Sequence, residues 1–187
     1  MGAVRQADLL VVEAAEKAVI DAIRFEFSTR STGNAASSTR RAQMLAQAAQ
    51  NYRLALQLDP NFSSNDPQLL NALGYFLAEK GASSTDFQKA ELLTRRALAG
   101  WDKAAKSALL KPAEVDLNRA ITRDSLAWAL FRQQKFAEAT REQRIAVADA
   151  QKALAAGAND PNGEALAELK THLQQIEAAL DTSKTKR

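Results

Sequence analysis

The sequence predicts an all-α protein of about seven helices packed as antiparallel hairpins. Helical periodicity of apolar residues runs through almost the whole chain and is interrupted only by compact clusters of Gly, Pro, Asn, Asp and Ser. No segment alternates apolar and polar residues for long enough to predict a strand. The composition agrees, because 39 of the 187 residues are alanine while Gly and Pro together number only 11. Average usage would give Gly plus Pro of roughly 12%, about twice this share.

Composition and charge exclude several classes of protein. Without a cysteine, the chain has no disulfide framework, no thiol catalysis and no Cys-ligated zinc or iron–sulfur site. No run of 18 apolar residues predicts a membrane span, so we expect a soluble protein of the cytoplasm, or of the periplasm after removal of a leader. The net charge of +3 comes from the last six residues, because residues 1–181 carry 22 basic and 22 acidic side chains. We therefore expect a neutral body and a basic, flexible tail over 182–187.

The first two helices are defined by the clusters that separate them. The first is predicted from about Val4 to Arg30 and is broken by Ser31-Thr32-Gly33-Asn34. Ser37 or Ser38 caps the second helix, which runs to Leu58. Asp59-Pro60 ends it, because the residue before a proline is pushed out of the α region.

The next two helices begin with strong capping signals. Asp66-Pro67 starts the third helix, with a capping residue followed by proline at the first helical position, and Gly81 ends it. The cluster Ser83 to Asp86 caps a fourth helix, which we expect to continue to Leu110.

The remaining three helices are separated by short turns. Lys111-Pro112 opens the fifth helix, which reaches about Gln133, and the sixth runs from Phe136 to Gly157. The turn residues 159–163 then lead into a last helix that ends at about Leu180.

Two of these hairpins share a sequence pattern, which indicates an internal repeat. The first copy reads Leu70-x-x-Leu73-Gly74-x-x-Leu77-x-x-x-Gly81, then Phe87-x-x-Ala90 and Ala97-Leu98. The second copy reads Leu126-Ala127-x-x-Leu130, then Phe136-x-x-Ala139 and Ala146-Val147. In both copies small residues stand where two helices would approach closely, and large residues would fill the space beside them.

These hairpins resemble the tetratricopeptide repeat, a helix–turn–helix unit of 34 residues. The resemblance covers roughly 38–150, with the clearest repeats at about 67–100 and 120–150 and a partial repeat at about 38–60. The chain departs from the family pattern in that 53 positions, not 34, separate Leu73 from Leu126. The resemblance implies a right-handed α-solenoid with lengthened helices, one domain over 1–181 and a capping helix at about 163–180.

The resemblance also implies a function, the binding of protein or peptide partners in a concave groove lined by the first helix of each repeat. The groove positions carried over to this sequence are Gln68, Asn71, Tyr75, Glu79, Asp124, Trp128, Phe131 and Arg132. Aromatic residues and arginine are the usual hot-spot types at interfaces. An alternative for Tyr75 and Trp128 is burial as core residues against a lengthened neighbouring helix.

An enzyme is not predicted. His172 is the only histidine, and it lies on the flank of the apolar stripe of the last helix, where we expect a partly exposed side chain without a catalytic role. The sequence has no glycine-rich phosphate loop, and we expect no cofactor and no metal. The stripe on the last helix is too short to predict a coiled coil, and closing the end of the repeat array is its more natural role.

Two further functions stay open as alternatives. Helical faces together with the basic tail could bind nucleic acid or another polyanion, although acidic residues are interspersed among the arginine pairs. The chain could also assemble with itself as a structural protein. We rank both behind a non-enzymatic scaffold that binds protein or peptide.

Overall fold

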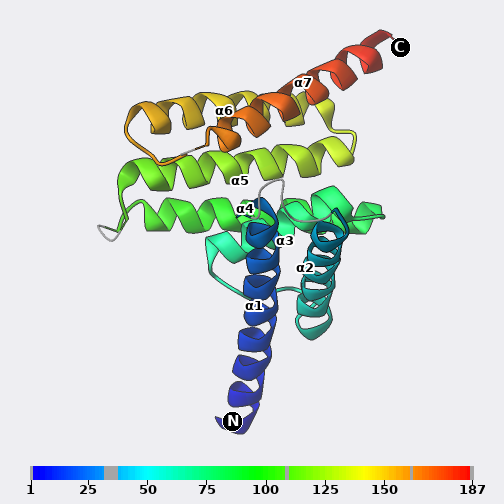
Figure 1. Ribbon diagram of the computed structural model, residues 1–187, viewed down its shortest axis with the longest axis vertical. Helices are drawn as coiled ribbons and strands as arrows, with labels where there is room; N and C mark the ends of the chain where they lie inside the picture. Colours follow the sequence, from blue (N-terminus) through cyan, green and yellow to red (C-terminus); the bar gives the residue numbers. More distant parts are fainter. Residues whose placement is uncertain (1, 32–37, 108–109, 161, 186–187) are drawn as a thin grey trace. The chain divides into compact units, whose positions relative to one another are not determined.

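The computed structural model describes residues 2–31, 38–107, 110–160 and 162–185. Over these residues the chain forms seven α-helices and no strand, which confirms the predicted all-α class (Figure 1). Backbone contacts divide the chain into two compact units, Met1–Asn65 and Asp66–Arg187, so each unit is described by itself. The prediction of one domain over 1–181 stays a prediction.

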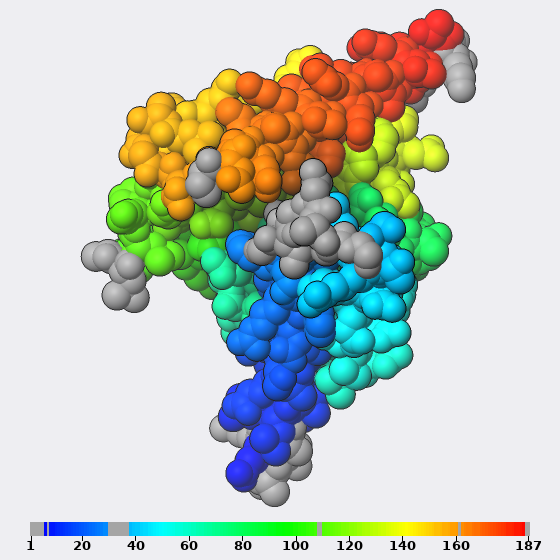
Figure 2. Space-filling view, in the orientation of Figure 1, coloured from blue at the N-terminus to red at the C-terminus, as the bar shows by residue number. Residues whose placement is uncertain are grey.

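The first unit is an antiparallel pair of helices, α1 (Gly2–Ser31) and α2 (Ser38–Leu58). Five of the eight apolar side chains buried in the described part of this unit are alanines, which lets the two helix axes approach closely. Tyr52 is the largest buried side chain of α2, and its hydroxyl donates a hydrogen bond to the Glu26 carboxylate at 3.1 Å. Because α1 is 30 residues long and α2 only 21, the N-terminal end of α1 extends past α2 (Figures 1 and 2).

The end of α2 confirms the interpretation of Asp59-Pro60 as a helix terminator. The helix stops at Leu58, and the Asp59 carboxylate then accepts hydrogen bonds from the backbone N–H groups of Asn61 and Ser63. The predicted break at Ser31-Thr32-Gly33-Asn34 and the Ser37 cap fall mostly or wholly on residues 32–37, which lie outside the described residues.

The second unit consists of two helical hairpins and a last helix. The five helices are α3 (Pro67–Lys80), α4 (Ser84–Ala104), α5 (Pro112–Arg132), α6 (Phe136–Ala155) and α7 (Glu164–Thr185). Each helix packs against the next one in the chain, and α5 also packs against both α3 and α7. This packing of consecutive helices is consistent with a helical repeat closed by a last helix, and it brings α3, α5 and α7 together.

The predicted caps of α3 and α4 are confirmed. The Asp66 carboxylate accepts hydrogen bonds from the N–H groups of Gln68 and Leu69, and Pro67 occupies the first helical position. Ser83 and Asp86 form a reciprocal capping box at the start of α4.

Small residues lie at the crossing of α3 and α4, as the repeat pattern predicts. A Cβ atom placed on Gly74 would stand 2.7 Å from the Thr94 side chain and 3.3 Å from the Ala90 carbonyl oxygen. In the second hairpin the equivalent residue, Ala127, is fully buried. Both hairpins therefore close at a position where a larger side chain would push the helices apart.

Two helix ends differ from the prediction. The fourth helix ends at Ala104 rather than Leu110, because the described residues that follow the buried Trp101 are exposed or half-exposed and packing does not hold them. The last helix continues past Leu180 to Thr185, so the first residues of the predicted tail are helical. Thr182 and Thr185 satisfy their hydroxyl groups on carbonyl oxygens four residues earlier, which lets these turn-favouring residues stay in the helix.

Candidate functional site

The structure brings six of the eight predicted groove residues into contacts with one another or with α7. These six are Tyr75 and Glu79 of α3 and Asp124, Trp128, Phe131 and Arg132 of α5. Their polar atoms bond to other side chains or backbone of the second unit. The predicted face is therefore largely occupied by the chain's own contacts, and α7 contributes several of them.

Tyr75 and Glu79 lie one turn apart on α3 and each bonds to a different helix. The Tyr75 hydroxyl donates to the Glu168 carboxylate of α7 at 3.0 Å. Burial, followed by the charge of Glu168, raises the pKa of Tyr75 far above its ordinary value, so this hydroxyl stays protonated and acts as a donor. The Glu79 carboxylate accepts from the indole N–H of Trp128 at 3.0 Å. Burial opposes its ionisation, but hydrogen bonds from Lys80 and Trp128 hold the pKa of Glu79 below its usual value.

A buried polar network joins α5, α6 and α7. Asp124 is only 3% exposed, and its carboxylate oxygens lie 2.9 and 3.0 Å from Nδ1 of His172. The side-chain amide of Gln143 donates to Asp124 and, at 2.8 Å, to the backbone carbonyl of Leu169. Three helices are therefore tied together by one carboxylate and its donors.

The expectation of a partly exposed His172 is wrong. His172 is only 8% exposed, since this flank of α7 faces Asp124 and Trp128 rather than solvent. Burial alone would lower the pKa of His172, but the hydrogen bond and charge of Asp124 outweigh it and raise that pKa. The cation is further favoured by the charges of Glu168 and Glu79. The geometry is that of a structural ion pair holding α7 in place.

A row of aromatic rings runs from the predicted face toward the α5–α6 turn. Trp128 stacks on His172 with ring centroids 4.6 Å apart and on Phe131 at 4.8 Å. Phe131 in turn contacts Phe136, at the start of α6, in a tilted arrangement at 5.7 Å. Trp128, Phe131 and Phe136, which we call the aromatic row, are all partly exposed.

Arg132 caps the C-terminal end of α3. Its guanidinium donates to the carbonyl oxygens of Ala78, Glu79 and Gly81 at 2.9, 3.1 and 3.3 Å. It also lies 4.4 Å above the ring of Phe87. A cation placed on the last carbonyls of a helix interacts favourably with the helix dipole, so a structural role accounts for this residue.

The other two predicted groove residues are not part of these contacts. Gln68 is exposed in the first turn of α3. Asn71 is partly buried, and its side-chain oxygen is a buried acceptor without a hydrogen-bond partner in the described part of the chain.

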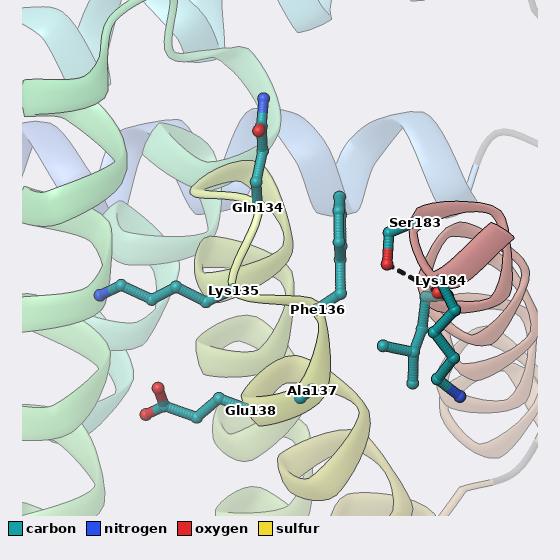
Figure 3. A pocket seen from close by; sticks show the side chains of 8 residues that line it. Gln134, Lys135, Phe136, Ala137, Glu138, Ser183 and Lys184 are labelled. Carbon is teal, nitrogen blue, oxygen red and sulfur yellow. Dashed lines mark hydrogen bonds between the residues drawn. The ribbon is translucent and has the colours of Figure 1, made fainter. Parts of the chain in front are cut away.

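A hollow of about 490 Å³ lies where the aromatic row ends. Its walls are the start of α6 and the last turns of α7, and its lining residues are Gln134, Lys135, Phe136, Ala137, Glu138, Leu180, Ser183 and Lys184. The ring of Phe136 stands between the two helices, facing the side where Ser183 and Lys184 lie (Figure 3). Lys135 and Glu138 extend to the other side, where they pair with Glu91 and Arg95 of α4.

A second hollow, of about 400 Å³, adjoins the first one at the α5–α6 turn. Arg132 and Phe87 line it, and the two hollows share Gln134 and Lys135. Gln134 has a positive φ of 62°, a left-handed conformation that a residue other than glycine rarely adopts. Its N–H and that of Lys135 bond back to the carbonyls of Phe131 and Leu130, which closes the end of α5.

Sequence analysis did not find the α7 side of this site. Glu168 lies one helical turn before His172, on the same flank of the apolar stripe, so that spacing was a signal for a polar edge on α7. No comparable pattern marks Gln143, because the residues around it in the sequence are typical of an ordinary exposed helix face. The hollow depends on how far α6 and α7 diverge, which the periodicity of either helix does not encode.

Three basic residues at the end of the chain, Lys184, Lys186 and Arg187, account for its net charge of +3. Lys184 lies in α7 and pairs with Asp181 at 3.3 Å, while Lys186 and Arg187 lie outside the described residues. In the described part of the chain, no three or more His, Asp or Glu side chains are grouped as a metal site would need. None of the helices, over the residues described, has the length and apolar character of a membrane span.

Comparison of the chain with models of known protein families, with curated protein sequences and with solved structures finds no match in any of the three.

Proposed function

We propose that this chain is a non-enzymatic scaffold that binds protein or peptide segments through its second unit, a right-handed stack of tetratricopeptide-like hairpins. The observation that carries the proposal is the aromatic row, which leads from the predicted groove residues to an open hollow beside Phe136. Aromatic side chains bury a large area at a small cost in conformational entropy, which is why they dominate binding surfaces.

Preorganisation supports this function. The ring of Trp128 stacks against both His172 and Phe131, and its N–H donates to Glu79. A partner that contacts the exposed part of Trp128 would not have to order that side chain, so less of the binding free energy would be lost to conformational entropy.

The absence of catalysis is part of the proposal. The only histidine of the chain uses Nδ1 to bind the buried Asp124, and this pair joins two helices. Its Asp124 partner is also held by Gln143. A role in positioning α7 accounts for this cluster without a reaction.

The experiment is a selection from a random 12-residue peptide display library on the full chain, followed by fluorescence anisotropy with the enriched peptides. Tyr75→Phe and Trp128→Phe keep an aromatic ring at each position but remove the hydroxyl and the indole N–H, whereas the Ala variants remove the rings. We expect the Phe variants to bind within about threefold of wild type and the Tyr75→Ala/Trp128→Ala variant to lose binding. Circular dichroism must show a folded variant for this loss to count.

The proposal is overturned if no peptide is enriched over a bare-surface control. It is also overturned if a folded Tyr75→Ala/Trp128→Ala variant binds every enriched peptide as wild type does, because neither the predicted groove residue Tyr75 nor the Trp128 end of the aromatic row would then have a part in recognition.

A further inference from the structure

The hollow between the start of α6 and the end of α7 has an apolar floor. Phe136 and Ala137 line it from α6 (Figure 3), and Leu180 lines it from α7. Its volume of about 490 Å³ lies within the range of sites that take a small ligand or a few side chains of a partner. An apolar side chain of a partner that packs on Phe136 and Leu180 would remove its own apolar surface and that of these two residues from water.

Basic residues outnumber acidic ones among the side chains that line this hollow and the adjoining one. Over the described residues that line the two adjoining hollows, Arg132, Lys135 and Lys184 are basic, and Glu138 is the one acidic residue. Glu138 is paired with Arg95 of α4, and Lys135 and Lys184 are paired with Glu91 and Asp181, which line neither hollow. The excess of basic over acidic residues is therefore a property of the lining, whereas residues 1–181 as a whole carry equal numbers of both.

Lys184 is the cation best placed to bind a ligand. Its pair with Asp181 is solvent-exposed, with side-chain exposures of 66% and 76%, and exposed pairs of this kind contribute about 0–1 kcal/mol. Lys184 can therefore exchange this partner for a carboxylate of a ligand at little cost. Lys135 is bound to Glu91 of α4 and does not reach the floor (Figure 3), so it is not available to a ligand.

We infer that the hollow between α6 and α7 binds an acidic segment of a partner protein, with one apolar side chain against Phe136 and Leu180 and a flanking carboxylate on Lys184. The inference rests on the proposed function and names the partner's chemistry. The charge complementarity selects an acidic partner over a basic one, and the apolar floor selects a peptide over a bare polyanion.

The test uses three fluorescein-labelled peptides, Asp-Asp-Leu-Phe-Asp-Asp, its Asn analogue Asn-Asn-Leu-Phe-Asn-Asn and its Lys analogue Lys-Lys-Leu-Phe-Lys-Lys. Anisotropy titrations of the full chain at low salt give the dissociation constants. We expect the acidic peptide to bind at least fivefold more tightly than the Asn analogue and the Lys analogue to bind least. Added salt should reduce the difference, since exposed charges are screened.

Two pairs of changes on α7 locate the site. Ser183→Glu/Lys184→Glu puts two carboxylates on the wall of the hollow, and we expect it to weaken the acidic peptide at least tenfold. Lys170→Glu/Thr171→Glu makes the same charge change on exposed residues earlier in α7, and we expect less than a twofold effect. Leu180→Asn removes the apolar wall and should weaken all three peptides, whereas Leu92→Asn, at an exposed position of α4, should not.

The outcomes separate the inference from the proposed function. Equal binding of the three peptides, or equal loss in the two charge variants, overturns the inference. If library peptides bind the aromatic row but carry no acidic residues, the inference fails and the proposed function stands. If no peptide of any charge binds, both fail. If the Ser183/Lys184 effect follows a change in self-association by sedimentation, the occupant is a second copy and the inference is wrong.

Discussion

Replacement of His172 by Phe tests the physical role of the buried network most sharply. Phenylalanine keeps an aromatic ring of similar shape against Trp128, which lies 4.6 Å away by ring centroid. It removes the Nδ1 group that lies 2.9 and 3.0 Å from the two Asp124 oxygens. The change therefore isolates the ion pair from the packing of the ring.

The expected cost follows from what remains around Asp124. Asp124 is 3% exposed, and among the described residues its carboxylate would keep only the amide of Gln143 as a side-chain donor. Breaking a buried ion pair by removing one partner costs about 3–5 kcal/mol, and the remaining donor places the estimate near 3. For a chain of this length such a loss lowers the Tm by roughly 6–12 °C.

The pH dependence gives an independent check. The pKa of His172 is raised in the folded chain, so its contribution to stability is fully present below the unfolded value of 6.5. That contribution is lost as the pH rises through the folded pKa. The difference in free energy of unfolding between wild type and His172→Phe should therefore be larger at pH 6 than at pH 9.

The assay is urea unfolding followed by circular dichroism at both pH values. Asp124→Leu/His172→Phe serves as the matched control, because replacing both partners by apolar groups leaves no unpaired buried charge. We expect the double change to recover at least half of the lost stability. A single change that costs less than about 0.5 kcal/mol, or a double change no more stable than the single one, would refute a role for the ion pair.

Three further changes test other parts of the fold by urea unfolding. Gly74→Ala should destabilise the protein by about 1 kcal/mol, since overpacking against Thr94 exceeds the gain in helix propensity. Thr94→Ser should reduce this cost because it removes the methyl group that the new Cβ would meet. An equal cost of Gly74→Ala with Thr94 and with Ser at position 94 would contradict the close crossing. Gln134→Gly should stabilise by roughly 0.5–1 kcal/mol because it removes the strain of a left-handed residue, and a loss of stability would count against that conformation. Glu91 has a pKa lowered to about 2, against burial, by bonds from Lys135, Gln133 and Arg95. Glu91→Gln should therefore lower the free energy of unfolding by about 2 kcal/mol at pH 7. The difference in stability between wild type and variant should vanish as the pH falls from 4.5 toward 2, where Glu91 becomes protonated. A full difference that persists at pH 2 would exclude the charge of Glu91 as its origin.

The helices of this protein could be predicted because local signals define them. Asp66 with Pro67 and the Ser83–Asp86 box specify where two helices begin, through side chains that bond to free N–H groups at once. Gly74 indicated a close crossing, because only a small residue fits there. The end of α4 was mispredicted, since it depends on where tertiary burial stops after Trp101.

The candidate site was predicted only in part. Tyr75, Trp128 and Asp124 share a face of their helices, so periodicity could bring them together. Helix periodicity does not determine the angle at which α7 crosses α5. This angle decides whether α7 covers the face through Glu168 and His172, so the sequence did not predict these contacts. The hollow beside Phe136 has the same origin, as the space left where two helices diverge.

The central claim is that the second unit binds a protein segment at the end of the aromatic row. Amide chemical-shift mapping of the ¹⁵N-labelled full chain with Asp-Asp-Leu-Phe-Asp-Asp tests it most directly. We predict saturable shifts that centre on Phe136, Leu180 and Lys184 and that disappear in the Ser183→Glu/Lys184→Glu variant. Shifts confined to Met1–Asn65, or no saturable shift at millimolar peptide, would contradict the claim.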